Sequence, residues 1–212
     1  MATPPSFTTI LLVRHGQTAT TGTVLPGRAP GLHLSERGRA QASAVAERIA
    51  ELTNKPVALY TSPLERARET AAPIAKALGL RARVERGLLE CDFGDWTGQR
   101  LSALRKKKEW GAVQHAPSSF RFPGGESFAE MQLRMWSTLI TLGARHCGKT
   151  LVVVSHADPI KAAVTHAQGV PLDLFQRTVI STCSISAVAL TDTAPVVLSV
   201  NNTGSLKELH LS

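Results

Sequence analysis

The stretch Ile10-Leu11-Leu12-Val13-Arg14-His15-Gly16 combines two signals that decide the fold. Its four apolar residues form a short continuous run, which is typical of a strand buried on both faces of a parallel sheet. The run stops at Arg14-His15-Gly16, which we interpret as a tight turn at the carboxyl end of that strand. The stretch Leu151-Val152-Val153-Val154-Ser155-His156 repeats this arrangement, so two histidines each follow an expected buried strand.

Amphipathic helical patterns alternate with the apolar runs. We expect helices over about 35–52, 62–79, 126–147 and 159–168, and further strands near 57–60, 184–190 and 195–200. Ser62-Pro63 is interpreted as an N-cap with proline at the first helical position. This alternation predicts an α/β fold, specifically a three-layer α/β/α sandwich around a mainly parallel central sheet. In such sheets ligands bind at the carboxyl ends of the strands, where His15 and His156 are both expected.

The length of 212 residues fits a single domain over 1–212, and no repeat or linker divides the sequence. Residues 91–125 interrupt the alternation, because they are rich in Gly and Pro and contain only a short basic helical pattern. We interpret them as an insertion over the active site and not as a second domain.

The composition restricts the classes of partner. A formal net charge of +8 favours an anionic ligand. The basic residues are scattered apart from Arg105-Lys106-Lys107-Lys108, which we interpret as a solvated face. One Tyr and three Trp offer no platform on which bases could stack. We therefore expect no nucleic acid, which leaves a small phosphorylated metabolite or an acidic lipid as the anionic partner.

The cysteines and the N-terminus predict the compartment. Cys91, Cys147 and Cys183 have no CxxC spacing, which argues against both a disulfide framework and a zinc site. Met1-Ala2-Thr3-Pro4-Pro5 lacks the basic and apolar segments of a signal peptide, and no apolar run approaches the ~18 residues of a membrane span. We expect a cytoplasmic protein with no membrane contact, no bound metal and no cofactor.

The tripeptide Arg14-His15-Gly16 has the residue types needed for phosphoryl transfer. A neutral imidazole is a competent nucleophile near pH 7, and a guanidinium offers a planar set of donors to a phosphate. Glycine lets the backbone approach a ligand closely. Taken alone, the tripeptide fits equally well a loop histidine beside a surface arginine.

Two further segments favour the chemical interpretation. In Ser62-Pro63-Leu64-Glu65-Arg66-Ala67-Arg68, Arg66 falls in the first turn of the expected helix, where free N–H groups favour an anion. Arg68 lies two positions on and should face elsewhere, so we assign it to the surface. His156, with Arg14 and Arg66, would complete a positive pocket that stabilises charge on a transferring phosphoryl group. For Asp158 we favour capping of the next helix.

These three segments, in this order, resemble the histidine phosphatase superfamily, in its phosphoglycerate-mutase-like branch. The resemblance covers about residues 10–201, and the segments at 90–98 and 122–127 are similar to those of short actinobacterial members labelled phosphomutases. It implies that His15 is the nucleophile and that Arg14, Arg66 and His156 form the phosphate pocket. It also implies that Glu90 is the proton donor to the leaving group, a role for which Asp92 and Asp95 are the alternatives.

The substrate-binding residues are less defined. The family commonly has an asparagine where this chain has Thr21, so we expect Thr21 or Thr18, or the backbone of Gly22 or Gly27, to donate to phosphate instead. A second departure is Ala157, where the family usually has glycine. The specificity wall is expected from 17–33 and 91–125, with Arg28, His33 and Trp96 as candidates to contact the leaving group.

The resemblance favours a metal-independent phosphatase that hydrolyses a small phosphomonoester through a phosphohistidine on His15. A phosphoglycerate-mutase-type phosphomutase is the alternative, although such mutases are usually longer than this chain. A non-catalytic phosphometabolite-binding protein is the third alternative, and it would be expected to lose His15 or Glu90. The sequence leaves a homodimer open.

Overall fold

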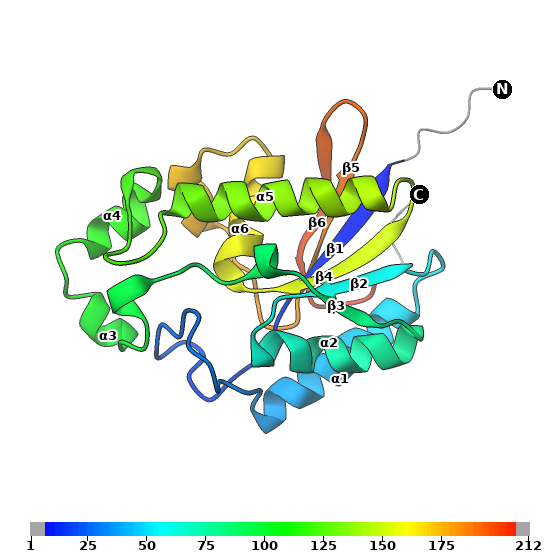
Figure 1. The fold of residues 1–212 in the computed structure, drawn as a ribbon, viewed down its shortest axis with the longest axis horizontal. Helices are drawn as coiled ribbons and strands as arrows, with labels where there is room; N and C mark the ends of the chain where they lie inside the picture. The colour runs from blue at the N-terminus through cyan, green and yellow to red at the C-terminus, as the bar shows by residue number, and fades with distance from the viewer. Residues whose placement is uncertain (1–6, 207–212) are drawn as a thin grey trace.

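The computed structural model describes residues 7–206; the N-terminal pentapeptide discussed above lies outside this range. A central sheet has six strands in the order β3-β2-β4-β1-β5-β6 (Figure 1). The strands are β1 (Thr8–Arg14), β2 (Ala58–Thr61), β3 (Ala82–Val84), β4 (Thr150–Ser155), β5 (Ile185–Leu190) and β6 (Pro195–Asn202). Strands β1 to β4 pair in parallel, whereas β5 and β6 run antiparallel at one edge. The α/β fold with a mainly parallel sheet is therefore confirmed.

Helices cover both faces of the sheet. One layer holds α1 (Glu36–Ala50) and α2 (Glu65–Leu78), and the other holds α5 (Phe128–Arg145) and α6 (Ala157–Ala167) (Figure 1). Alternate residues of β1 explain this arrangement, because Leu11 and Val13 pack towards α1 and α2 while Ile10 and Leu12 pack towards α5 and α6. Both faces are apolar, so the strand is a continuous apolar run.

Local signals determine where several helices begin and end. Ser35 accepts a hydrogen bond from the Gly38 N–H and caps α1. Ser127 and Glu130 form a reciprocal capping box at the start of α5. Gly79 ends α2 in the left-handed conformation, at φ 64°.

Other boundaries differ from the sequence-based expectations. Helix α2 starts at Glu65 with Leu64 as its N-cap residue, so the prediction that Ser62 caps it was wrong. Helix α6 starts at Ala157, and the capping role predicted for Asp158 was also wrong, because no side chain caps this helix. Instead, a carboxylate oxygen of Asp158 lies 3.3 Å from the ammonium of Lys161.

The segment between β3 and α5 contains mostly short helices. These are α3 (Leu101–Leu104), α4 (Trp110–His115) and the 3₁₀ turns η1 (Arg86–Leu88), η2 (Gly94–Trp96) and η3 (Pro117–Ser119); a fourth turn, η4 (Leu172–Arg177), follows α6. The aromatic residues of the segment between β3 and α5 belong to a third apolar cluster, in which Trp96 is 3% exposed. Backbone hydrogen bonds between Leu25 and Gln99 and between Leu101 and Thr23 tie this segment to the 17–33 loop. Within residues 7–206, no helix is long and apolar enough to cross a membrane.

Candidate active site

Two neighbouring strands bring the two histidines together. In the parallel pairing of β1 with β4, Arg14 lies opposite Ser155, so His15 and His156 leave the sheet side by side at its carboxyl edge. The His15 N–H donates to the Ser155 carbonyl at 3.0 Å. The two rings have their centroids 5.2 Å apart, and both side chains are buried. The sheet register therefore places two imidazoles in one pocket.

The hydrogen bonds of His15 indicate which ring nitrogen is reactive. Nδ1 lies 2.7 Å from the carbonyl oxygen of Gly16, which can only accept, so Nδ1 carries the proton. Nε2 is then left with a free lone pair, towards which Arg66 Nε donates at 3.3 Å. Burial, reinforced by the positive charges of Arg66 and Arg14, lowers the pKa of His15 to about 3. His15 is neutral at physiological pH, with Nε2 available as a nucleophile.

Arg66 is the second residue of α2 and is fully buried. Its Nη2 donates to the carbonyl of Gly27 at 2.8 Å, whereas its Nη1 has no partner among the described residues. Thr70, one turn along the helix, accepts from the Gly16 N–H at 3.0 Å and donates to the Arg66 carbonyl at 2.7 Å. The turn after His15 and the start of α2 are thereby held against each other.

Arg14 and His156 present two further unpaired nitrogens. Arg14 Nη1 donates to the Ile180 carbonyl at 2.6 Å, while its Nε is buried without a partner in the described chain. His156 Nε2 lies 2.8 Å from the hydroxyl oxygen of Ser62, and His156 Nδ1 has no partner there either. The Ser62 hydroxyl can donate to Nε2 while its oxygen accepts from the Leu64 N–H. In that tautomer His156 carries its proton on Nδ1 and offers it to a ligand.

Glu90 lies just after the 3₁₀ turn η1 and is 7% exposed. Its Oε1 accepts from the Cys91 N–H at 2.9 Å. Burial, helped by the negative charge of Asp158, raises the pKa of Glu90 to about 7, against the opposing effect of Arg66 and Arg14. The carboxyl can therefore be protonated near neutral pH, as a proton donor requires.

The remaining candidates make contacts within the protein. The Thr21 hydroxyl accepts from the Thr18 N–H at 2.9 Å and lies 3.0 Å from the Thr18 hydroxyl. Gly27, at φ 52°, supplies the carbonyl that holds Arg66, and a Cβ there would lie 2.8 Å from the Thr97 hydroxyl. Arg28 donates to the Glu90 carbonyl at 2.8 Å and pairs with carboxylates, so its position favours a different role from substrate binding.

Two candidates for the leaving-group wall lie elsewhere. Trp96 is in the aromatic core cluster, between Trp110 and Phe122. His33 is paired with Glu69 on the surface. Sequence reasoning missed Ser62 as a partner of His156, although its position directly after β2, at the same edge of the sheet, was a usable signal.

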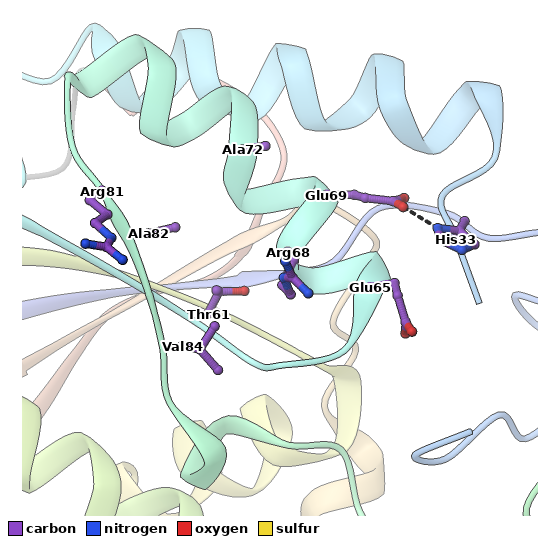
Figure 2. Close-up of a pocket in the computed structure, with 9 residues that line it drawn as sticks. All are labelled: His33, Thr61, Glu65, Arg68, Glu69, Ala72, Arg81, Ala82 and Val84. Atoms are coloured by element: carbon purple, nitrogen blue, oxygen red, sulfur yellow. Dashed lines mark hydrogen bonds and ion pairs between the residues drawn. The ribbon is translucent and has the colours of Figure 1, made fainter. Parts of the chain in front are cut away.

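A separate cleft of about 640 Å³ lies on the outer side of α2, next to the edge strand β3. Figure 2 shows Arg68, Glu65 and Glu69 extending from α2 into this cleft, with Glu69 joined to His33. Arg68 therefore lies on a different face of α2 from the buried Arg66, as the spacing predicts. Within residues 7–206, no group of three or more His, Cys, Asp or Glu side chains is arranged to hold a metal ion.

Comparisons with known proteins identify the family of this chain. The family model for the histidine phosphatase superfamily (branch 1) matches residues 10–203. The chain is 32% identical over 208 residues to phosphoserine phosphatase 1 of Hydrogenobacter thermophilus, which covers 95% of this chain and 96% of that protein. It is 33% identical over 162 residues to the metal-independent phosphoserine phosphatase of Arabidopsis thaliana, covering 73% of this chain and 66% of that one.

A solved structure gives the same result for the fold. The phosphoserine phosphatase of Entamoeba histolytica, in complex with 3-phosphoglyceric acid, superimposes with a TM-score of 0.82 at 26% identity, over 92% of this chain and 98% of that one. The family match spans most of the sequence, and the curated relative is similar along almost its full length. This chain therefore belongs to the histidine phosphatase superfamily, branch 1.

Proposed function

We propose that this protein is a metal-independent phosphatase that hydrolyses a small phosphomonoester through a phosphohistidine on His15. The observation that carries the proposal is a set of three buried nitrogens, from three separate parts of the chain, without partners among residues 7–206: Arg14 Nε, Arg66 Nη1 and His156 Nδ1. Buried donors normally have hydrogen-bond partners, so three unpaired nitrogens near His15 indicate a site for a ligand with several acceptor oxygens. A phosphate group has that chemistry.

In the first step, His15 Nε2 attacks phosphorus, and the bond from phosphorus to the ester oxygen breaks as the P–N bond forms. The guanidinium groups of Arg14 and Arg66 and the N–H of His156 stabilise the charge on the three non-bridging oxygens. Glu90 gives its proton to the leaving alkoxide, which is a poor leaving group without it. The hydrogen bond from His15 Nδ1 to the Gly16 carbonyl stabilises the positive charge of the phosphohistidine.

In the second step, the Glu90 carboxylate takes a proton from water, and the water oxygen attacks phosphorus while the P–N bond breaks. Inorganic phosphate leaves, and both His15 and Glu90 return to their starting protonation states. The arginines supply the positive charge that a metal ion supplies in other phosphatases. Hydrolysis is favoured over mutase action because the related proteins named above are phosphatases.

The relatives also suggest the class of ester. All three are named phosphoserine phosphatases, and one of them was crystallised with 3-phosphoglyceric acid. We propose that the substrate is a small phosphomonoester that carries a carboxylate, such as these two compounds.

The test is release of inorganic phosphate from a panel of phosphomonoesters by the wild type and His15→Ala, with and without EDTA. The panel includes phosphoserine and 3-phosphoglycerate, the latter with and without 2,3-bisphosphoglycerate and with isomerisation followed. We expect phosphate release that depends on His15 and is unchanged by EDTA. Isomerisation without net phosphate release would instead identify a mutase, and loss of activity with EDTA would contradict metal independence.

A further inference from the structure

The carboxylate of Glu126 lies between two arginines that come from distant parts of the chain. Its Oε1 is 2.8 Å from Arg134 Nη2, and its Oε2 accepts from both Arg134 Nη2, at 3.1 Å, and Arg28 Nη2. The Glu126 side chain is 14% exposed. The three side chains therefore form one largely buried cluster, with Arg28 from the 17–33 loop and Arg134 from α5.

The same two arginines hold the backbone that carries Glu90. Arg28 Nε donates to the Glu90 carbonyl at 2.8 Å, and Arg134 Nη2 lies 3.4 Å from the same oxygen. Arg134 Nη1 also donates to the carbonyls of Gly87, at 2.7 Å, and Leu89, at 2.9 Å. Four contacts thus fix the backbone on the N-terminal side of Glu90 and at Glu90 itself.

Glu126 holds the other side of Glu90 directly. Its backbone N–H donates to the Asp92 carbonyl at 3.0 Å, and its Oε2 accepts from the Asp92 N–H at 3.3 Å. Gly125 lies so close to this strand-like contact that a Cβ there would be 2.3 Å from the Asp92 oxygen. Glu126 is therefore joined to Arg28, to Arg134 and to the backbone of Asp92.

The charges of the cluster balance. Arg28 and Arg134 are matched by Glu126 and by Asp92, whose Oδ2 lies 3.2 Å from Arg28 Nη1. The charges that shift the pKa of the Glu90 carboxyl then come mainly from other elements. These are Arg14 from β1, Arg66 from α2 and Asp158 from α6. Removal of the Glu126 charge would leave one positive charge uncompensated beside the Glu90 backbone.

We propose that Glu126 is a positioning residue that, through Arg28 and Arg134, holds the Glu90 loop in place and neutralises the arginines that support it. The proposal rests on the proposed function only in that Glu90 acts as the proton donor. Arg28 and Arg134 share this role, which gives Arg28 a function other than contact with substrate.

Glu126→Gln tests the proposal, because the amide keeps the shape and one acceptor oxygen but loses the charge. We expect kcat for an alkyl phosphate to fall by roughly 10-fold or more, since a displaced or deprotonated acid no longer assists the leaving group. For p-nitrophenyl phosphate, whose leaving group needs little protonation, we expect a loss of less than about threefold. KM should change little for either ester, because the phosphate pocket is untouched.

Glu130→Gln is the matched control. Glu130 lies four residues after Glu126, in the first turn of α5, and also pairs with an arginine, Arg121, but that pair is exposed and its hydrogen bonds within the described chain do not include the Glu90 loop. Glu130→Gln should leave kcat unchanged for both esters. The proposal would be overturned if Glu126→Gln lowered kcat equally for both esters. It would also be overturned if Glu126→Gln and Glu130→Gln had equal effects on kcat. If Glu126→Gln does not fold, Arg28→Lys keeps the charge but loses the Nε contact, and should show the same ester dependence.

A second readout separates this proposal from the proposed function. The titration of Glu90 is followed by NMR with ¹³C-labelled glutamate in the wild type and in both variants, using Glu90→Gln to assign the signal. We expect Glu126→Gln to lower the pKa of Glu90, and Glu130→Gln to leave it unchanged. An unchanged or higher value in Glu126→Gln contradicts the positioning role, even if the wild type proves to have no phosphatase activity.

Discussion

Arg66 and Arg68 lie two residues apart on α2 and occupy opposite environments. A helix turns by about 100° per residue, so the two side chains point in nearly opposite directions. Arg66 is fully buried against His15 and keeps Nη1 unpaired. Arg68 is exposed in the outer cleft, where Glu65 and Glu69 also lie (Figure 2). The difference teaches that burial and an unpaired donor, and not positive charge alone, make Arg66 the candidate for phosphate binding.

The largest expected effect separates these two arginines. Arg66→Met should lower kcat/KM by roughly 10²- to 10³-fold, because a buried donor to the transferring phosphoryl group is lost. Arg68→Met should change kcat/KM by less than about twofold, since a solvated arginine outside the pocket contributes little to an anion at the site. Steady-state kinetics on the best ester of the panel measures both. Similar losses of kcat/KM in the two variants would contradict the distinction between Arg66 and Arg68. Circular dichroism checks that both variants remain folded.

Glu90→Gln should give a smaller effect that depends on the substrate. An alkyl phosphate should be hydrolysed about 10²-fold more slowly, because the leaving alkoxide is no longer protonated. An aryl ester with a good leaving group should lose less than about tenfold. Asp95→Asn is the control, since Asp95 is an exposed carboxylate near Glu90 in the chain that could be confused with the acid. Equal slowing of both esters by Glu90→Gln would remove Glu90 as the proton donor.

The pH profile of the wild type should carry the signature of the same group. Because burial raises the pKa of Glu90 to about 7, its protonated form is lost as the pH rises through neutrality, and kcat for the alkyl ester should fall there. His15, with its pKa lowered to about 3, stays neutral above about pH 4 and adds no limb near neutrality. The falling limb should be absent in Glu90→Gln. If the fall in kcat persists in Glu90→Gln, a group other than Glu90 causes it.

The parts of the fold that follow from local pattern were predictable from the sequence. The apolar runs ending at His15 and His156 indicated two buried strands, and both histidines lie at the carboxyl edge of the sheet. Ser35 and Gly79 marked the ends of α1 and α2. These signals work because a capping residue and a continuous apolar run are recognised from residues adjacent in the chain.

Other features depend on contacts that no local pattern contains. The three-residue strand β3 escaped prediction because it is a short, mostly exposed edge strand without an apolar run. Ser62 followed by Pro63 matches an N-cap pattern, but β4 brings His156 next to Ser62, and the hydroxyl contacts the ring instead of the helix. In the cluster of Arg28, Glu126 and Arg134, the paired residues Arg28 and Glu126 are 98 residues apart in the chain. Side-chain partners at that separation become visible only in the folded protein.

The most direct test of the central claim is to trap the phosphoryl group on the enzyme. The wild type and His15→Ala are mixed with the best phosphomonoester, quenched in alkali, where phosphohistidine survives, and digested for mass spectrometry. The account predicts a phosphorylated peptide containing His15 in the wild type, formed within one turnover and absent from the variant. Phosphate release by the wild type with no label on His15, or turnover retained in His15→Ala, would contradict it.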